Sequence, residues 1–416
     1  MPGRCYAQAV LWAALIWGSV ILTLKTIAVR VVALCVAAGI WLPNMHHLFA
    51  VDTSEYRQDV GVAPKARMMA ERHLAIWRDP DLRAQELKKM QKVNPEWDFM
   101  SRTYFVLALA NIALRDPSYE DIACEIIDAI IENTRRLERE KGINHFLLGY
   151  ARHRPWVMRP ARSQFIDGEI ALMMATRRFI REDLRYQAPL QELSRVMIAR
   201  MEQSAVLSAE SYPNQAWLFC NTVSLAAIRM MDVLDGSDHS EFLARWISTA
   251  QRGLMDRATG MLISSYALDG TPDPSGDCPE GSTIFMSAHM LEIVDAEFAV
   301  DQYRRAAQAL RKSFLGFGYA AEWSSRCQGR HDVDSGPIVP FLDASAGSSG
   351  MAVLGSAVFD DEAYLSELLR SLEFAAFPEE KNGQLVYHAS NPVGDAVLLY
   401  GLVEGPLWRR VMEGRR

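Results

Sequence analysis

The stretch from Ser211 to Ser224 combines residue types that suit the wall of a binding pocket. A helix that begins near Asn214 would place four of its side chains on one face, at positions i, i+3, i+4 and i+7. These side chains belong to Trp217, Cys220, Asn221 and Ser224. An indole, a thiol, a carboxamide and a hydroxyl form a poor core stripe, but together they can hold and orient a partly apolar ligand. The alternative is a buried helix in which the cysteine behaves as a small hydrophobe.

Two other segments carry carboxyl groups that suit acid–base chemistry. Glu169 precedes the apolar run Ile-Ala-Leu-Met-Met, so it can lie beside a core-facing surface and have a raised pKa. The plainer interpretation is that Asp167 is a helix N-cap and Glu169 only complements the helix dipole. Asp332 and Asp334 are two residues apart and would point the same way in an extended segment, which suits an acid–base pair. A solvated turn explains them equally simply, because Ser, Gly and Pro follow.

The remaining polar residues predict no metal site. His388 is the one histidine that we consider for proton transfer, although a lone loop histidine is more often incidental. Glu280 and Ser282 precede an apolar helix, which they are expected to cap beside the pocket mouth. The six cysteines show no CxxC spacing, so neither a zinc site nor a disulfide framework is indicated. We expect free thiols, with a single bridge left open.

The composition excludes some partners. The chain has 416 residues and a net charge of -7, with acidic and basic residues interleaved. Because the sequence has no cluster of basic residues that could bind a phosphate backbone, we expect no nucleic-acid partner. The length allows a large core, in one domain or two.

The N-terminus has the composition of a membrane segment. Ala9–Leu24 and Val31–Pro43 are apolar, and the cations Lys25 and Arg30 lie between them. Each run is short for a full span, so we expect either a pair of short helices or a signal-like segment, and favour an uncleaved anchor over residues 1–44. The positive-inside rule would place the following domain on the exported side, which we favour, but Arg4 competes with that orientation.

The body of the chain predicts an all-α fold. Amphipathic segments follow one another with few alternating stretches, and long polar connections separate them. We expect a linker with leading helices over residues 45–94 and a helical domain over residues 95–416. The expected architecture of that domain is a ring of paired helices with the long loops over one mouth. Helices are expected at 65–77, 80–92, 100–115, 120–140, 166–182, 189–203, 214–233, 239–254, 281–298, 300–316, 345–356, 361–373 and 393–404.

Several segments together carry a family pattern. They are Pro213–Asn221, Ala244–Trp246, Leu254–Gly260, Ser264–Tyr266 and Asp334–Gly350, with weaker similarity at Ala113–Pro117 and Asp167–Met174. In these segments the sequence resembles the linalool dehydratase/isomerase family, over roughly residues 95–400. The resemblance implies an α/α barrel of six helix pairs and an activity that needs no cofactor. That activity removes water from a tertiary allylic alcohol, or isomerises it to a primary one, in a pocket of cysteine, acidic, tyrosine and histidine side chains.

The resemblance also assigns positions in this chain. Cys220 corresponds to the second of two pocket cysteines, whereas the first falls on Ser211, the pocket histidine on Glu169 and a tyrosine near Met100. The family's N-terminal aspartate and tyrosine have no counterpart, although Trp97, Asp98 and Arg102 lie close in sequence. A serine hydroxyl is a much weaker acid than a thiol, and a glutamate can replace the acid–base capacity of a histidine. We therefore expect the fold and pocket position to be kept and the substrate to differ.

These observations predict a membrane-anchored hydro-lyase or isomerase that acts by acid–base catalysis on a small, partly apolar hydroxylated molecule. The predicted catalytic residues are Glu169, Cys220, Asp334 and Asp332, and the predicted substrate-binding residues are Asp167, Ser211, Asn214, Gln215, Trp217, Asn221 and His388. A carbohydrate-active enzyme and a non-catalytic ligand-binding protein are the alternatives. A homo-oligomer is compatible with the sequence.

Overall fold

The computed structural model describes residues 3–273, 278–327 and 335–414, with side chains from Thr23 onward. The chain divides into two compact units. One contains the residues up to Ala50 together with Phe314–Phe317, and the other contains Val51–Ser313 and the chain from Gly318. Residues 51–94, expected to be a linker with leading helices, thus belong to the same unit as the barrel.

The first unit consists mainly of one helix, α1 (Gly3–Asn44). Of the two alternatives that the sequence left open, the pair of short helices is not formed, because Lys25 and Arg30 are good helix formers and continue one helix between the apolar runs. By length and composition, α1 is the one helix among the described residues that is able to cross a membrane. A 3-10 helix, Met45–Phe49, follows, and the ring of Phe49 lies 6.0 Å from that of Phe317 within the same unit.

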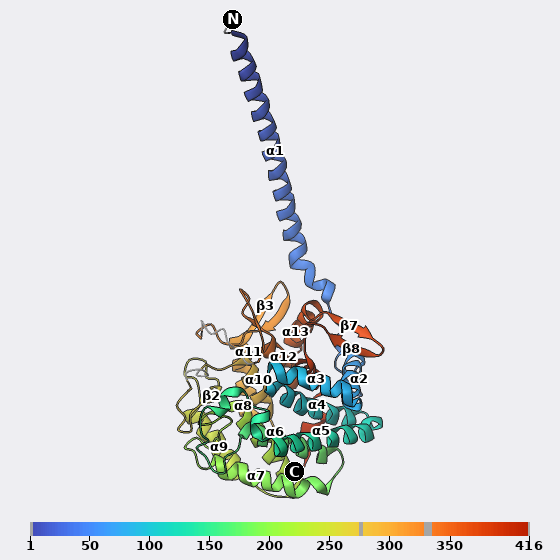
Figure 1. The fold of residues 1–416 in the computed structure, drawn as a ribbon, viewed down its shortest axis with the longest axis vertical. Coiled ribbons are helices and arrows are strands. Elements are labelled where there is room, and N and C mark those ends of the chain that lie inside the picture. Colours follow the sequence, from blue (N-terminus) through green and yellow to red (C-terminus); the bar gives the residue numbers. More distant parts are fainter. Residues whose placement is uncertain (1–2, 274–277, 328–334, 415–416) are drawn as a thin grey trace. The chain divides into compact units, whose positions relative to one another are not determined.

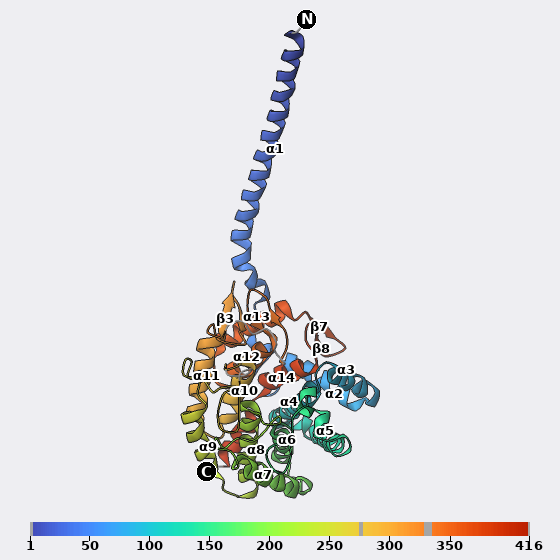
Figure 2. The ribbon, with the colours of Figure 1, turned by 60° about the vertical axis from the view of Figure 1, so that its left-hand side comes forward.

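The second unit is a closed ring of six inner helices. They are α4 (Pro95–Arg115), α6 (Gln164–Ile180), α8 (Leu218–Asp235), α10 (Gly281–Leu291), α12 (Ala346–Val358) and α14 (Pro392–Val403). Each packs on the next in this order (Figure 1), and α14, which is labelled in Figure 2, closes the ring by packing on α4. Inner helices are surrounded by protein, and every residue of α6 is accordingly buried.

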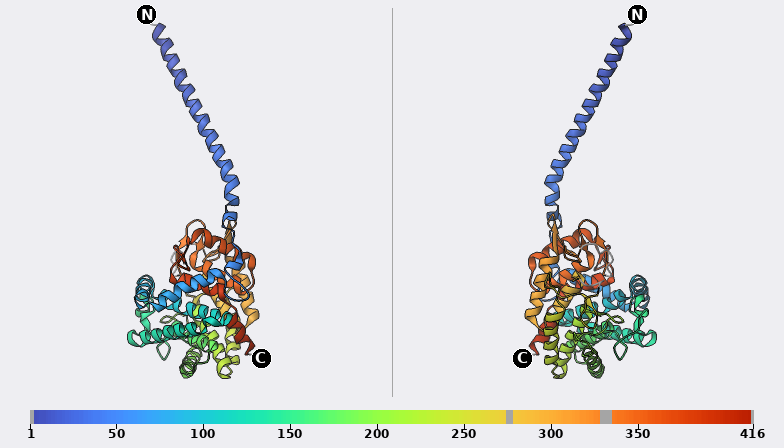
Figure 3. Two further views of the ribbon diagram at one scale, coloured as in Figure 1. Left: turned by 90° about the vertical axis from the view of Figure 1, so that its right-hand side faces the viewer. Right: turned by 90° about the vertical axis from the view of Figure 1, so that its left-hand side faces the viewer.

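Outer helices surround this ring. They are α5 (Glu120–Lys141), α7 (Gln187–Met201), α9 (Ser240–Gly253), α11 (Ala296–Leu310) and α13 (Glu362–Ala375), with α2 (Pro64–Arg78) and α3 (Pro80–Val93) at the sixth position. The last helix, α15 (Pro406–Glu413), ends on the side of the barrel opposite α13 (Figures 1 and 3). The outer helices are buried on one face only, as α5 shows with its isoleucines. The predicted all-α barrel of six helix pairs is confirmed.

Short antiparallel pairs lie in the connections between the helices, and two of their strands, at 216–217 and 311–314, replace parts of the predicted helices 214–233 and 300–316. The pairs are β1 (Ala216–Trp217) with β2 (Ser265–Tyr266), β3 (Arg311–Phe314) with β4 (Phe317–Ala320), β5 (Ile338–Val339) with β6 (Ala344–Ser345), and β7 (Pro378–Lys381) with β8 (Gln384–Tyr387). The β7–β8 hairpin packs on α2, and the two lie side by side in Figures 1 and 2.

The structure corrects the predicted helix start near Asn214. Asn214 has a left-handed backbone with φ of 59°, and Trp217 is extended and pairs with Ser265. The helix α8 therefore begins at Leu218. Asparagine tolerates the left-handed region better than most residues, which favours a turn at this position over a helix.

A disulfide joins Cys278 and Cys327, which is the single bridge that the sequence left open. It connects the segment before α10 with the segment after β4. The cysteines are 49 residues apart, so spacing in the sequence gave no signal for the pair.

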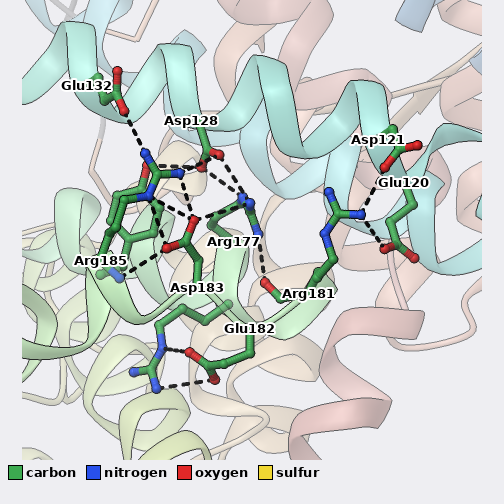
Figure 4. Close-up of polar contacts among 11 residues, drawn as sticks. Glu120, Asp121, Asp128, Glu132, Arg177, Arg181, Glu182, Asp183 and Arg185 are labelled. Carbon is green, nitrogen blue, oxygen red and sulfur yellow. Dashed lines mark hydrogen bonds and ion pairs between the residues drawn. The ribbon is translucent and has the colours of Figure 1, made fainter.

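A network of ion pairs fastens α5 to the C-terminal end of α6 (Figure 4). Asp128 is its centre: it accepts hydrogen bonds from Arg177 at 2.8 Å, Arg185 at 3.0 Å and the Tyr186 hydroxyl at 2.9 Å. Arg177 also donates to the backbone oxygen of Arg181. Because the side chain of Arg177 is only 5% exposed, removing its partner Asp128 would leave a buried charge unpaired and cost more than the loss of a surface ion pair.

Candidate functional site

The barrel unit contains a cavity of about 980 Å³ at the N-terminal ends of the inner helices. All six inner helices contribute a side chain from their first turns, and the connecting segments complete the wall. Helix N-termini carry partial positive charge, so this end of the barrel favours anionic groups. The predicted gathering of long loops over one mouth is consistent with this arrangement.

The cavity wall is apolar with a few charged groups. Its apolar residues include Trp97, Met100, Phe165, Tyr212, Trp217, Phe219, Met351, Val393 and Val397. Its charged or titratable residues are Glu96, His153, Arg154, Cys220, Asp273 and Glu280, among those described. A wall of this kind holds an amphiphilic ligand by its apolar part and orients it by its polar part.

Glu96 and Tyr212 form a pair on this wall. The Tyr212 hydroxyl donates a hydrogen bond to the Glu96 carboxylate and accepts one from the backbone N–H of Leu148 at 2.9 Å. The Tyr212 ring stacks on Tyr150 at a centroid distance of 4.5 Å. Burial, followed by the charge of Glu96, raises the pKa of Tyr212 well above its ordinary value, so the phenol keeps its proton. Asn94 caps α4 by accepting from the Glu96 N–H, which fixes the first turn of the helix.

Cys220 lies in the first turn of α8 and lines the cavity. Burial raises the pKa of its thiol well above the ordinary value, and a hydrogen bond with the Ser211 side chain opposes this shift. The group is therefore a neutral thiol at neutral pH, able to give a weak hydrogen bond but not prepared as a thiolate nucleophile. The Ser211 hydroxyl also accepts from the Trp217 N–H at 3.2 Å.

Glu169 lies behind this wall, in the second turn of α6, and is only 1% exposed. Its carboxyl group accepts a hydrogen bond of 2.5 Å from the Thr103 hydroxyl. Burial raises the pKa of Glu169 to about 8, Thr103 opposes the shift, and the charge of Glu96 adds to it. The charge of Glu169 in turn raises the pKa of Cys220, so these groups are electrostatic neighbours. Ser163, not Asp167, is the N-cap of α6.

The predicted substrate-binding residues are placed in different ways. Gln215 and Trp217 line the cavity, and the Gln215 amide donates to Asp273 at 3.2 Å. Asn221 instead serves the fold, since its side chain bonds both polar groups of the Ala209 backbone. Asn214 lies in the turn, where its backbone N–H donates to Glu210 at 2.6 Å.

Asp167 and His388 are not among the residues that line the cavity. Asp167 is fully buried and binds the Arg162 guanidinium through both carboxylate oxygens. His388 is exposed and its ring bonds Glu379 at 2.7 Å. Asp332 and Asp334 lie outside the described residues.

Two buried glutamates hold segments of the wall in place. Glu210 accepts from the backbone N–H groups of Val157 and Met158, at 2.9 Å and 2.8 Å, besides that of Asn214. Glu322 accepts from four serine hydroxyls, those of Ser282, Ser345 and Ser348 at the starts of α10 and α12 and that of Ser335 at 3.4 Å. Sequence reasoning missed both glutamates and the Glu96–Tyr212 pair, because their partners are distant in the chain. Among the described residues, no group of three or more His, Cys, Asp or Glu side chains is placed to hold a metal ion.

Comparison with solved structures finds barrels of low sequence identity. An unsaturated glucuronyl hydrolase from Bacillus sp. GL1 has 11% identity and a TM-score of 0.47, over 72% of this chain and 84% of that chain. A GH76 alpha-mannanase from Bacteroides thetaiotaomicron has 10% identity and a TM-score of 0.40, over 76% and 87% of the two chains. No curated protein matches the chain. Similarity at this level carries no argument about the reaction.

A family model gives the decisive comparison. The model for linalool dehydratase/isomerase matches residues 166–392, which is more than half of the 416 residues. The match runs from the start of α6 to the start of α14 and includes Glu169, Ser211 and Cys220, whereas Glu96 lies before it. The chain therefore belongs to the linalool dehydratase/isomerase family.

Proposed function

We propose that the barrel is a cofactor-independent hydro-lyase or isomerase that acts on a partly apolar, hydroxylated molecule. The observation that carries the proposal is the convergence of Glu96, Tyr212 and Cys220 on one largely apolar cavity, together with the buried Glu169, which interacts electrostatically with both Glu96 and Cys220. Removal of water from an alcohol needs a proton for the leaving hydroxyl and a base for a neighbouring carbon-bound proton. Groups with separated proton affinities supply these two roles in one site.

The proposed role of each side chain in the reaction follows from how deeply it is buried in the barrel. Glu169 holds a proton at neutral pH and is the proposed proton source, and Cys220, whose thiol feels the charge of Glu169, is the hydrogen-bonding group on the cavity wall. Glu96, whose carboxylate accepts a hydrogen bond from the Tyr212 hydroxyl, is the proposed base that takes a proton from the substrate. The aromatic wall, with Trp217 and Trp97, flanks cationic charge that develops as the hydroxyl leaves, since indole faces attract cations.

The volume of the cavity favours a substrate larger than the smallest terpenoid alcohols. Pockets of roughly 300–1,000 Å³ hold drug-sized ligands, and this cavity lies at the upper end of that range. The proposed substrate class is therefore an isoprenoid-like alcohol with an extended apolar part.

The experiment is a turnover assay on the full chain in neutral detergent. Isoprenoid alcohols of increasing chain length are the substrates, and gas chromatography with mass spectrometry detects dienes and allylic isomers. The variants Glu96→Gln, Tyr212→Phe and Cys220→Ala test the wall, and Glu125→Gln is the control because Glu125 is exposed on the outer helix α5. Loss of a group that transfers protons costs about 10²–10⁴-fold in rate.

Three outcomes separate the candidates. Turnover that falls in the wall variants and not in the control supports the proposal. Turnover that is equal in all variants refutes the assigned roles. Ligand binding without turnover, unchanged by Glu169→Gln and Cys220→Ala, favours the non-catalytic binding protein.

A carbohydrate-active enzyme is the second candidate. The observation in its favour is that three carboxyl groups, those of Glu96, Asp273 and Glu280, share the cavity with tryptophan and tyrosine side chains. Sugar rings stack on such side chains, and glycosidases use paired carboxyl groups. Release of reducing sugar from uronic-acid or mannose oligosaccharides, abolished in Glu280→Gln, would favour this candidate over the dehydratase.

The proposed location is the extracytoplasmic side of a membrane, with α1 as an uncleaved anchor. The length and composition of α1 support the anchor. The Cys278–Cys327 disulfide supports the exported side, because disulfides persist mainly in oxidising compartments. Protease protection of the barrel in sealed vesicles tests the orientation.

A further inference from the structure

Large apolar side chains are exposed at one edge of the cavity. They belong to Val339, Phe341, Leu342 and Phe377, which we call the rim surface. Phe341 is fully exposed and Phe377 is 65% exposed. A group of apolar side chains on the surface of a folded protein commonly marks a binding surface.

The rim surface borders the cavity through two connections. Val339, Phe341 and Leu342 belong to the β5–β6 hairpin, and the residues directly before and after this hairpin, Pro337 and Ala346, line the cavity. The second connection joins Phe377 to the cavity wall. The backbone oxygen of Phe377 accepts from the N–H of His388, and the next residue, Ala389, lines the cavity.

The segment that carries Phe377 lies close to the point where the chain enters the barrel unit. In the barrel unit, the Tyr56 hydroxyl and the Lys65 ammonium both bond Glu373, four residues before Phe377, the latter at 2.8 Å. Tyr56 follows Asn44, the end of α1, by 12 residues, which span at most about 40 Å when fully extended. The real span is shorter, because Met45–Phe49 form a 3-10 helix with a rise of about 2 Å per residue.

These observations point to the rim surface as a binding surface and to the lipid bilayer as its partner. We propose that the rim surface lies in the headgroup region of the bilayer that α1 crosses, so that the cavity opens at the lipid–water interface and takes its substrate from the lipid phase. This inference rests on the proposed membrane anchor. Aromatic side chains are stable at the interface, and an extended isoprenoid-like alcohol partitions into lipid rather than water.

The charge near the rim surface determines which lipid the test vesicles should contain. Glu379 and Glu380 follow Phe377 after one proline, so attraction to anionic lipid does not drive the contact. Apolar insertion of the aromatic rings is the proposed force, and vesicles of phosphatidylcholine are the appropriate probe.

The experiment uses spin labels on the full chain in phosphatidylcholine vesicles. Labels are introduced by Phe341→Cys and Phe377→Cys in a background in which the four cysteines outside the disulfide are replaced by serine. Leu184→Cys is the matched control, because Leu184 is 71% exposed and precedes α7, which lies on the side of the barrel opposite α13 (Figures 1 and 2). Electron paramagnetic resonance compares the accessibility of each label to oxygen, which concentrates in lipid, and to a water-soluble nickel complex.

We expect the labels at the two rim positions to be more accessible to oxygen than to nickel, and the control label to show the reverse order. Rim labels that are as accessible to nickel as the control overturn the docking surface. Flotation of the same vesicles tests the anchor separately. A chain that floats but has water-exposed rim labels refutes the rim surface alone, whereas a chain that does not float refutes both the anchor and the surface.

Discussion

The substitution Glu169→Gln tests the buried carboxyl group without any knowledge of the substrate. The pKa of Glu169 is raised from 4.5 to about 8 in the folded chain, chiefly by burial. Between these pH values the folded chain holds a proton that the unfolded chain has released, so the free energy of unfolding falls as pH rises. The stabilising contribution is complete below pH 4.5 and lost above about pH 8. At about 1.4 kcal/mol per pH unit, the total loss is at most about 5 kcal/mol.

The neutral amide in Glu169→Gln removes this dependence. The variant should match the parent chain near about pH 5 and exceed it by a few kcal/mol near about pH 9. Urea unfolding followed by tryptophan fluorescence, in neutral detergent across this range, measures the difference. Glu125→Gln is the control, because Glu125 is on the exposed face of α5. If parent and variant lose stability in parallel as pH rises, the buried carboxyl group does not carry the proton and the assigned proton source is wrong.

Three further perturbations test the framework around the site. Asp128→Asn should lower the free energy of unfolding by about 2–4 kcal/mol, less than the loss of a fully buried pair because Asp128 is 18% exposed, and denaturant unfolding measures this. Reduction of the Cys278–Cys327 disulfide should cost up to about 4 kcal/mol, from the entropy of the 49-residue loop, and a stability equal to that of the oxidised chain would contradict the bridge. In Gly168→Ala the new Cβ would lie 2.5 Å from the Ser224 hydroxyl of α8 and should cost about 1–3 kcal/mol; adding Ser224→Ala should restore part of the melting temperature.

The parts of the fold that could be predicted are those that local pattern determines. The α5 isoleucines recur at helical spacing on one face, and that face is the one buried. The barrel of six helix pairs was expected only from the resemblance to the family, because helical periodicity in a sequence does not show which helices are neighbours in space. The predicted helix start near Asn214 is wrong, because a left-handed turn and a two-residue strand take the place of the first helical turn. Local spacing could not show either feature, since β1 exists only by pairing with β2, which is nearly 50 residues away in sequence.

The candidate site was predictable in part for the same reason. Glu169 precedes an apolar run, which is a local sign of a buried carboxyl group, and the structure places it in the core. Glu96 follows Asn94 and Pro95, so in sequence it is an ordinary acidic residue of a helix's first turn. Its partner Tyr212 is 116 residues away, and only the closed ring brings the two together. Residues whose role depends on such a contact give no signal in a single sequence.

The ring also explains how one end of the barrel can hold both an acid and a base. Glu96 lies in the first turn of α4, at the cavity, where helix N-termini and the Tyr212 hydroxyl stabilise negative charge. Glu169 lies one turn deeper on the neighbouring helix α6, where burial disfavours charge and the carboxylate of Glu96 disfavours it further. Removing the charge in Glu96→Gln should therefore lower the pKa of Glu169 and shift the pH dependence of stability to lower pH. A shift in the opposite direction would show that the two groups are not coupled as the structure places them, and the assignment of acid and base would have to be abandoned.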